Sequence, residues 1–153
     1  MNALELKIPP VALVLIFAAA MWVASTQLPF LSATLPSRHA ISIAIAVGGV
    51  FFAGAGVLAF RQARTTVDPT TPGETSCVVA SGIYRFSRNP MYVGFLLLLA
   101  GWAVHLSHLV AYVLLPAFVA YMTRFQIVPE ERALLAKFGD SFVAYMRSVR
   151  RWL

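Results

Sequence analysis

Four long apolar segments constrain the fold of this chain more than any other feature. They cover roughly residues 10–28, 40–60, 91–104 and 109–128. A helix needs about 20 apolar residues to cross the ~30 Å hydrocarbon core of a bilayer, and the first two segments approach that length. Segments in lipid become helices, because a helix satisfies its backbone polar groups internally. We therefore expect an all-α integral membrane protein with four transmembrane helices.

Composition supports a membrane protein over a soluble one. The chain is 59% hydrophobic and only 12% charged, whereas soluble domains are about half apolar and a quarter charged. Its 153 residues allow a single domain. Lys7 before the first segment is reminiscent of a signal peptide, but no convincing cleavage site follows, so a retained first span is expected. The third segment is short and must extend, tilt or pair with the fourth through the tight "HLSH" turn, and Pro116 is expected to kink the fourth.

The basic residues are distributed asymmetrically around these spans. With four spans, both termini and the central loop 61–90 lie on one side. Eleven of the 12 basic residues fall on that side, and only Arg38 falls on the other. The positive-inside rule then predicts that both termini are cytoplasmic, and we expect a bacterial inner-membrane protein. Topology and anionic lipid account for the net charge of +6, so no nucleic-acid partner is expected.

Two further stretches have a structural interpretation. The second segment contains "AVGGVFFAGAG", whose small residues predict close packing between membrane helices. From Glu130 onward, apolar residues recur every three or four positions, which predicts a cytoplasmic C-terminal amphipathic helical segment over 130–153. Gly139 should end its first helix, and Asp140 should cap the next.

Most polar residues that suggest chemistry fall at two places. One is the end of the loop 61–90, and the other is Glu130-Glu131 directly after the fourth span. Because spans three and four form a hairpin, residues 89–92 should lie beside the two glutamates. The carboxylates could instead simply favour a helix N-terminus.

Several other chemistries find little support. The three histidines fall on the opposite side, and Cys77 is the single cysteine, so no metal site is expected. No nucleophile elbow, Walker loop or dinucleotide fingerprint occurs. No span carries a charge at mid-membrane depth, which argues against an ion pathway. The polar residues therefore suit a soluble cofactor that meets a lipophilic substrate at the membrane boundary.

Two separated motifs carry a family resemblance. "SGIYRFSRNPMYVG" followed by "EERALLAKFGDSFVAYMRSVRRWL" resembles the isoprenylcysteine carboxyl methyltransferase family and, more distantly, phospholipid N-methyltransferases. The resemblance covers about residues 66–153. Its matching positions are Gly82, Tyr84, Arg88, Asn89, Pro90, Tyr92, Gly94, Glu130, Glu131, Phe138, Gly139, Phe142 and Tyr145.

The resemblance implies a membrane methyltransferase that uses S-adenosylmethionine. Its implied cofactor-binding residues are Ser76, Cys77, Val78, Val79, Tyr84, Asn89, Pro90, Met91, Tyr92 and Glu130. For the acceptor it implies an arginine near the end of span four, where this chain offers Arg124 and, closer in alignment, Gln126. The eukaryotic enzymes have His at the positions of Ser76 and Asn89, so the resemblance leaves the prenylcysteine substrate open.

Residue chemistry agrees with these roles. Glu130 and Glu131 suit the ammonium group of the cofactor, and Arg88 or Arg85 suits its carboxylate. Tyr84 or Tyr92 can cover the adenine or ribose. Because methyl transfer is an in-line displacement, positioning and water exclusion dominate catalysis, and we assign Arg88 and Glu131 as candidate catalytic residues.

The acceptor is predicted from the shortage of general bases. A carboxylate, or an easily ionised thiol, needs little or no help to ionise, whereas a phospholipid amine must lose a proton. No cytoplasmic histidine is expected to take that proton, so we favour a lipophilic carboxylate or thiol, held by Arg88 or Arg124. The alternatives are a phospholipid N-methyltransferase, a small transporter or scaffold, and a reductase that binds NADPH.

Overall fold

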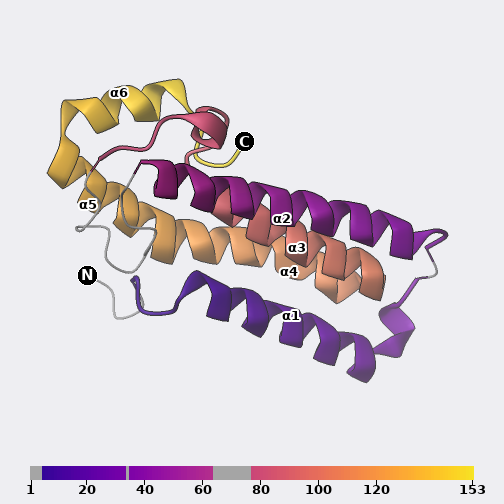
Figure 1. Ribbon diagram of the computed structural model, residues 1–153. Coiled ribbons are helices and arrows are strands. Elements are labelled where there is room, and N and C mark those ends of the chain that lie inside the picture. Colours follow the sequence, from indigo (N-terminus) through magenta and orange to yellow (C-terminus); the bar gives the residue numbers. More distant parts are fainter. Residues whose placement is uncertain (1–4, 34, 64–76) are drawn as a thin grey trace.

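The computed structural model describes residues 5–33, 35–63 and 77–153, and every regular element within these ranges is helical (Figure 1). The elements are α1 (Pro10–Gln27), η1 (Pro29–Leu31), α2 (Arg38–Gln62), η3 (Gly82–Arg85), α3 (Pro90–Leu106), α4 (Leu109–Met122), the π-helical η4 (Thr123–Ile127), α5 (Val128–Phe138) and α6 (Asp140–Ser148). The expected all-helical class is confirmed for these ranges.

Three helices are long and apolar enough to cross a membrane. They are α1, α2 and the continuous helix Leu109–Phe138, which runs from α4 through η4 into α5. α3 is apolar but has only 17 residues. Length and composition therefore support three of the four expected spans. The helix that contains the fourth expected span continues past residue 128, because the π-helical segment η4 leads directly into α5.

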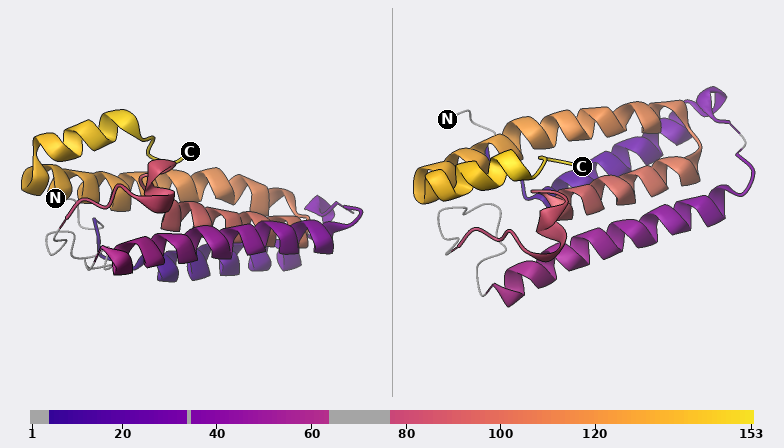
Figure 2. Two further views of the ribbon diagram at one scale, coloured as in Figure 1. Left: turned by 45° about the horizontal axis from the view of Figure 1, so that its top comes forward. Right: turned by 90° about the horizontal axis from the view of Figure 1, so that it is seen from above.

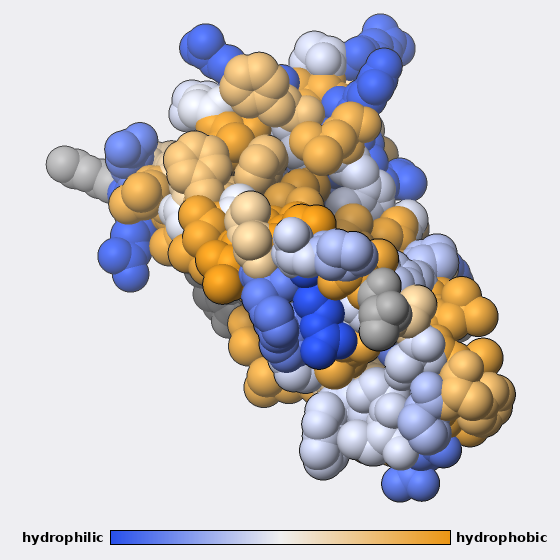
Figure 3. Space-filling model, turned by 90° about the vertical axis from the view of Figure 1, so that its right-hand side faces the viewer, coloured by the Kyte–Doolittle hydropathy of each residue, from blue (hydrophilic) through white to orange (hydrophobic). Residues whose placement is uncertain are grey.

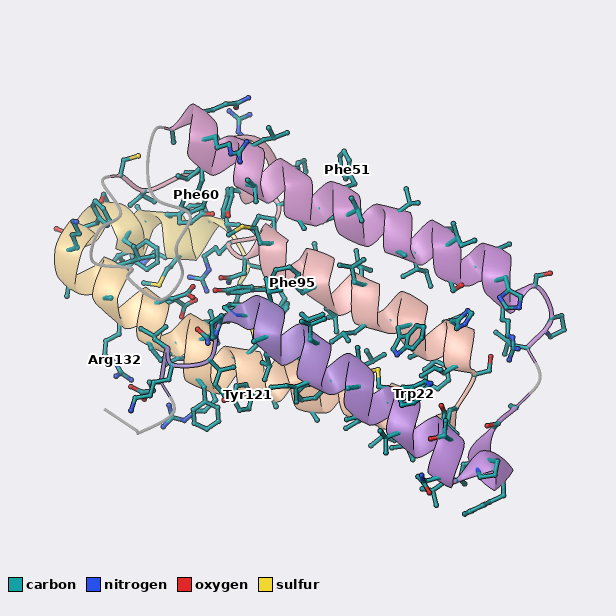
Figure 4. The ribbon with its side chains drawn as sticks, turned by 60° about the horizontal axis from the view of Figure 1, so that its bottom comes forward. Trp22, Phe51, Phe60, Phe95, Tyr121 and Arg132 are labelled. Atoms are coloured by element: carbon teal, nitrogen blue, oxygen red, sulfur yellow. The ribbon has the colours of Figure 1, made fainter. Side chains whose placement is uncertain are left out.

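Large apolar side chains point outward from α1 and α2. Trp22 and Phe51 are 55% and 65% exposed, and Figure 4 shows Phe51 pointing away from the bundle. Apolar side chains also cover much of the surface in the view of Figure 3. Exposed apolar faces of this extent would be unfavourable in water. With the apolar helices, they identify an integral membrane protein.

Helices α2 and α3 pack closely because glycines meet at their interface. A Cβ atom on Gly94 would lie 2.7 Å from the backbone nitrogen of Ala53 and from the backbone oxygen of Gly49. Gly49 and Gly101 are similarly tight. In contrast, Gly48 has open space around it. The predicted role of small residues in helix packing is thus confirmed for the glycines that face α3.

A second interface joins α1, α3 and α4. Its buried core includes Met21, Leu99, Phe118 and Met122. The turn between α3 and α4 is tight, as expected, with Ser107 in the left-handed conformation at φ 50°. This hairpin brings the start of α3 beside the end of η4 and the start of α5.

One end of the bundle, called the polar end here, contains the start of α1, the end of α2, the start of α3, and α5 (Figure 1). Figure 2 shows α6 folded back over this end, with the last residues of the chain lying across the start of α3. Gly139, at φ 53°, separates α5 from α6 as predicted. The predicted cap was wrong: Asp140 is the first residue of α6, and no side chain caps that helix.

Candidate active site

Polar side chains from the loop, α3, α5, α6 and the C-terminal tail meet at the polar end. We call this group the polar cluster, and it comprises Tyr84, Arg88, Asn89, Tyr92, Glu130, Glu131, Tyr145 and Arg151. Pro90 fixes where α3 begins, because proline suits the first turn of a helix and keeps the preceding Asn89 out of the helical conformation. The loop therefore delivers Arg88 and Asn89 to the place where the apolar part of α3 begins.

The first carboxylate of the pair, Glu130, binds a tyrosine. The buried Tyr92 phenol of α3 donates a hydrogen bond to Glu130 Oε1 on α5. The predicted meeting of residues 89–92 with the two glutamates is confirmed. This contact places a carboxylate where the apolar core of the bundle ends.

The second carboxylate, Glu131, binds two arginines. The Arg151 guanidinium donates two hydrogen bonds to the Glu131 carboxylate. Nε donates to Oε1 at 3.0 Å, and a terminal nitrogen donates to Oε2 at 2.7 Å. Arg88 adds an ion pair of 3.0 Å, with only 11% of its side chain exposed. Bidentate, charge-assisted contacts are the stronger kind. Glu131 is therefore held in place, whereas Glu130 lies outside this arginine network.

The C-terminal tail completes the polar cluster through its backbone. The backbone N–H of Arg88 donates to the carbonyl of Arg150 at 2.9 Å. The Asn89 side-chain amide donates to the carbonyl of Arg151 at 2.9 Å. Trp152 Nε1 donates to Thr123 Oγ1 at 3.1 Å. These bonds fix the tail across the start of α3 and against η4.

Two further phenols flank the carboxylates. The Tyr145 hydroxyl donates to the Tyr84 backbone carbonyl at 2.8 Å, which ties α6 to the loop. Burial raises the pKa of the Tyr84 phenol far above its usual value, with smaller contributions from Tyr145 and Glu130. Burial likewise raises the pKa of the Tyr145 phenol, although Arg88 partly opposes the shift. Both phenols are therefore neutral hydrogen-bond donors at physiological pH.

Comparisons with known proteins identify the family. The phospholipid methyltransferase family matches residues 37–141, which is more than half of the chain. The chain belongs to the phospholipid methyltransferase family. A 63-residue stretch, 41% of the chain, is also 40% identical to the whole of an uncharacterized protein from Haemophilus influenzae. No solved structure matches the chain.

Family membership makes this protein a membrane methyltransferase, and the match includes the loop, α3 and both glutamates of the polar cluster. Six residues that the sequence analysis predicted for the site meet in the polar cluster: Tyr84, Arg88, Asn89, Tyr92, Glu130 and Glu131.

Apart from Val78, the other predicted cofactor-binding residues that the structure describes lie against α2, and Val79 and Cys77 also share a cluster with Tyr84. Val79 is buried beside Ala59 at the end of α2, with Cys77 packed on the same cluster. Val78, which lies between Cys77 and Val79 in the sequence, is half-buried. The Met91 side chain packs against Gly56 of α2, and Pro90 lies close to the same glycine. Ser76 lies outside the described residues.

The two predicted acceptor-binding residues contact the N-terminal segment of this methyltransferase. Arg124 forms an ion pair with Glu5 at 3.3 Å. Gln126 is buried in η4, and its amide nitrogen donates to the carbonyl of Ile8. Both therefore lie on the side of η4 that faces the start of the chain.

Sequence reasoning missed three members of the arrangement. Tyr145 appeared in the motif and on the apolar face of the C-terminal helix, but we assigned it no role. Arg151 is one of the eleven basic residues on the predicted cytoplasmic side, and Trp152 is one of the apolar positions of the C-terminal helical segment. Their contacts with Glu131 and Thr123 depend on the tail turning back after α6, which no local pattern indicates. Among the described residues, no group of three or more potential metal ligands occurs in this family member.

Proposed function

We propose that this protein transfers a methyl group from S-adenosylmethionine to a lipophilic acceptor at the cytoplasmic membrane face. The observation that carries the proposal is the polar cluster itself. Two carboxylates and two arginines are held where apolar helices end, so a water-soluble donor and a membrane-embedded acceptor can reach the same place. Family membership supports the reaction class.

The residues present fit such a cofactor. Glu130 is held by the Tyr92 phenol and, among the described residues, by no arginine, so its carboxyl group suits the ammonium group of the cofactor. Nε of Arg88 is buried and lacks a hydrogen-bond partner among the described residues, so it suits a carboxylate. Tyr84 packs in one cluster with Val79 and Cys77. This cluster, the backbone of residues 77–79 and the Asn89 side chain suit the ribose and adenine.

When bound, S-adenosylmethionine would supply an electrophilic methyl group on a sulfonium. The protein's part is then to bind, orient and exclude water. Arg88 and Glu131 position each other, and Arg151 fixes Glu131 through its planar fork. The tail from Val149 onward covers the start of α3 and shields the cluster from water.

The first candidate acceptor is a lipophilic carboxylate or an easily ionised thiol, as in the isoprenylcysteine carboxyl methyltransferases that the motifs resemble. None of the cluster side chains is a histidine, and Glu131 is occupied by arginines. A carboxylate arrives already ionised and needs only a cation for orientation.

A phospholipid amine is the second candidate, and the family match favours it. Glu130 is the cluster carboxylate that lies outside the arginine network, so it is the group best placed to accept an amine proton. A methylation screen would distinguish the candidates, with prenylcysteines, lipophilic thiols, fatty acids and phosphatidylethanolamine as acceptors and a radiolabelled methyl donor. Turnover confined to phosphatidylethanolamine would overturn the preference for a carboxylate or thiol.

Calorimetry in detergent tests the core of the proposal. Wild-type protein should bind S-adenosylmethionine saturably, and Glu130→Gln should abolish or greatly weaken binding because the ammonium loses its counter-charge. Asp140→Asn is the matched control, since it removes one exposed carboxylate from α6 outside the cluster. Folded wild-type protein that bound NADPH and not S-adenosylmethionine would instead support a reductase.

A further inference from the structure

The N-terminal segment Glu5–Ile8 is bound to the outer side of η4 and α5. The carboxylate of Glu5 bridges two arginines, with Arg124 at 3.3 Å from one oxygen and Arg132 at 3.5 Å from the other. Only 3% of the Glu5 side chain is exposed, whereas the two arginine side chains are 50% and 58% exposed. Figure 4 shows Arg132 of α5 beside this part of the chain.

The π-helical geometry of η4 provides a further attachment. The π-helical turn interrupts the regular backbone ladder, and Pro129 has no N–H to donate to the carbonyl of Phe125. Such turns recur at functional sites. Here the carbonyl of Phe125 accepts a hydrogen bond from the backbone N–H of Leu6 at 3.0 Å. Gln126 holds the carbonyl of Ile8 from the same segment. The N-terminal segment thus contacts the backbone of η4 as well as the arginine side chains of η4 and α5.

Two buried polar atoms beside this contact have no hydrogen-bond partner within the described ranges. Gln126 is fully buried, and its Oε1 has no hydrogen-bond partner among the described residues. The same holds for the hydroxyl of Tyr121, whose ring packs against Phe125 at 4.8 Å. Buried polar groups are normally paired, so such atoms call for an explanation. A ligand with its own polar groups would satisfy them.

We propose that Glu5 is an internal stand-in for the acceptor: it occupies the site in which Arg124, the acceptor-binding arginine that the resemblance implies, and Arg132 hold the oxyanion of a lipid. The proposal rests on the proposed function, because the lipid is the methyl acceptor. Its oxyanion is either a phosphodiester or a carboxylate, and both match the geometry that guanidinium groups prefer. Glu5 presents the same chemistry from within the chain.

Position and chemistry both support this assignment. Arg132 directly follows the glutamates of the polar cluster on α5, and η4 contacts the C-terminal tail at Thr123, so a lipid headgroup held here lies at the same end of the bundle as the proposed transfer site. The contacts of η4 with the start of the chain lie where α1 enters its apolar part at Pro10. A lipid anion would displace Glu5 without leaving the arginines unpaired. The Glu5 segment therefore exchanges with the acceptor and is not a permanent anchor.

A spin label at position 7 tests the exchange without any methylation step. Lys7 is exposed, so Lys7→Cys in a Cys77→Ala background places the label outside the contacts described. In detergent without S-adenosylmethionine, the label should be immobilised in the free protein. It should become mobile on titration with dihexanoylphosphatidylethanolamine or N-acetyl-farnesylcysteine. Whichever lipid acts at the lower concentration identifies the oxyanion as a phosphodiester or a carboxylate.

Variants and a neutral lipid sharpen the test. Glu5→Gln should lower the lipid concentration for half-maximal mobility by about fivefold, because the competing carboxylate is removed. Arg132→Gln should raise it, and Asp140→Asn should leave it unchanged. The proposal is overturned if neither the phosphodiester lipid nor the carboxylate lipid mobilises the label in the protein that keeps Glu5, Arg124 and Arg132, or if dihexanoylglycerol, which has no oxyanion, does so equally well. Because S-adenosylmethionine is absent, failure of the proposed methyl transfer would not affect this result.

Discussion

Two glutamates that are neighbours in the sequence have different surroundings in the structure. Glu130 accepts a hydrogen bond from the Tyr92 phenol, whereas Glu131 is fixed by Arg88 and Arg151. Adjacent positions on a helix point in different directions, so one residue faces α3 and the other faces the tail. The pair therefore offers one carboxylate for a ligand and one for the scaffold.

Among single residues, Tyr92→Phe should lower the free energy of unfolding. The partly buried carboxylate of Glu130 would lose its donor, and hydrogen bonds to charged groups contribute about 1.5–3 kcal/mol. Thermal unfolding in detergent measures the loss. Tyr112→Phe is the control, because Tyr112 lies exposed on α4. Equal unfolding temperatures for the two variants would contradict a role for the Tyr92–Glu130 contact.

Arg151→Lys should weaken S-adenosylmethionine binding several-fold while the protein stays folded. Lysine keeps the charge but lacks the planar fork that grips both oxygens of Glu131. Calorimetry measures the affinity. Arg147→Lys on the exposed face of α6 provides the comparison, and a similar loss there would indicate a general effect of charge placement.

The sequence predicted much of the polar cluster but not all of it. The hairpin topology alone placed residues 89–92 beside the glutamates, because tight turns between apolar helices leave few arrangements. Arg151 was not predictable, since its contact depends on a change of chain direction after Ser148 that has no local signal. The contact of Glu5 with η4 joins residues at opposite ends of the chain and was missed for the same reason.

At the scale of elements, α2 and α3 are held together by close backbone approach. Gly94→Ala should destabilise the pair, because the new Cβ would meet backbone atoms of Ala53 and Gly49 at 2.7 Å. Overpacking of this kind costs about 1–3 kcal/mol. Gly48→Ala is the matched control on the open side of α2. Gly94→Ala should lower the unfolding temperature more than Gly48→Ala does. Equal unfolding temperatures would show that the α2–α3 interface accommodates the added methyl group without cost.

Helix ends show where sequence patterns stop being informative. Pro90 and Gly139 marked their boundaries correctly, because each has a backbone preference that acts locally. The π-helical segment at 123–127 was not predicted, since its residues are ordinary helix formers. The carbonyl of Phe125 is free because Pro129, four residues on, has no N–H to donate, and this carbonyl accepts a hydrogen bond from Leu6 instead.

For the whole molecule, the orientation in the membrane is the main prediction. The described basic residues other than Arg38 lie on the elements of the polar end, so this end should face the cytoplasm. In a Cys77→Ser background, Pro36→Cys should react with an impermeant thiol reagent added to intact cells. Ala136→Cys should react only after the cells are opened. Both positions are exposed, and labelling of position 136 from outside would reverse the orientation.

The tight turn at Ser107 also bears on the order in which the protein is assembled during synthesis. α3 is the shortest of the apolar helices, and its glycine face is complete only against α2. We therefore expect α3 and α4 to insert into the bilayer together, as one helical hairpin. Until that hairpin closes, Tyr92 and Glu130 emerge 38 residues apart and remain in water. The proposed methyl-transfer site would then form late in biogenesis, after the hairpin has been inserted.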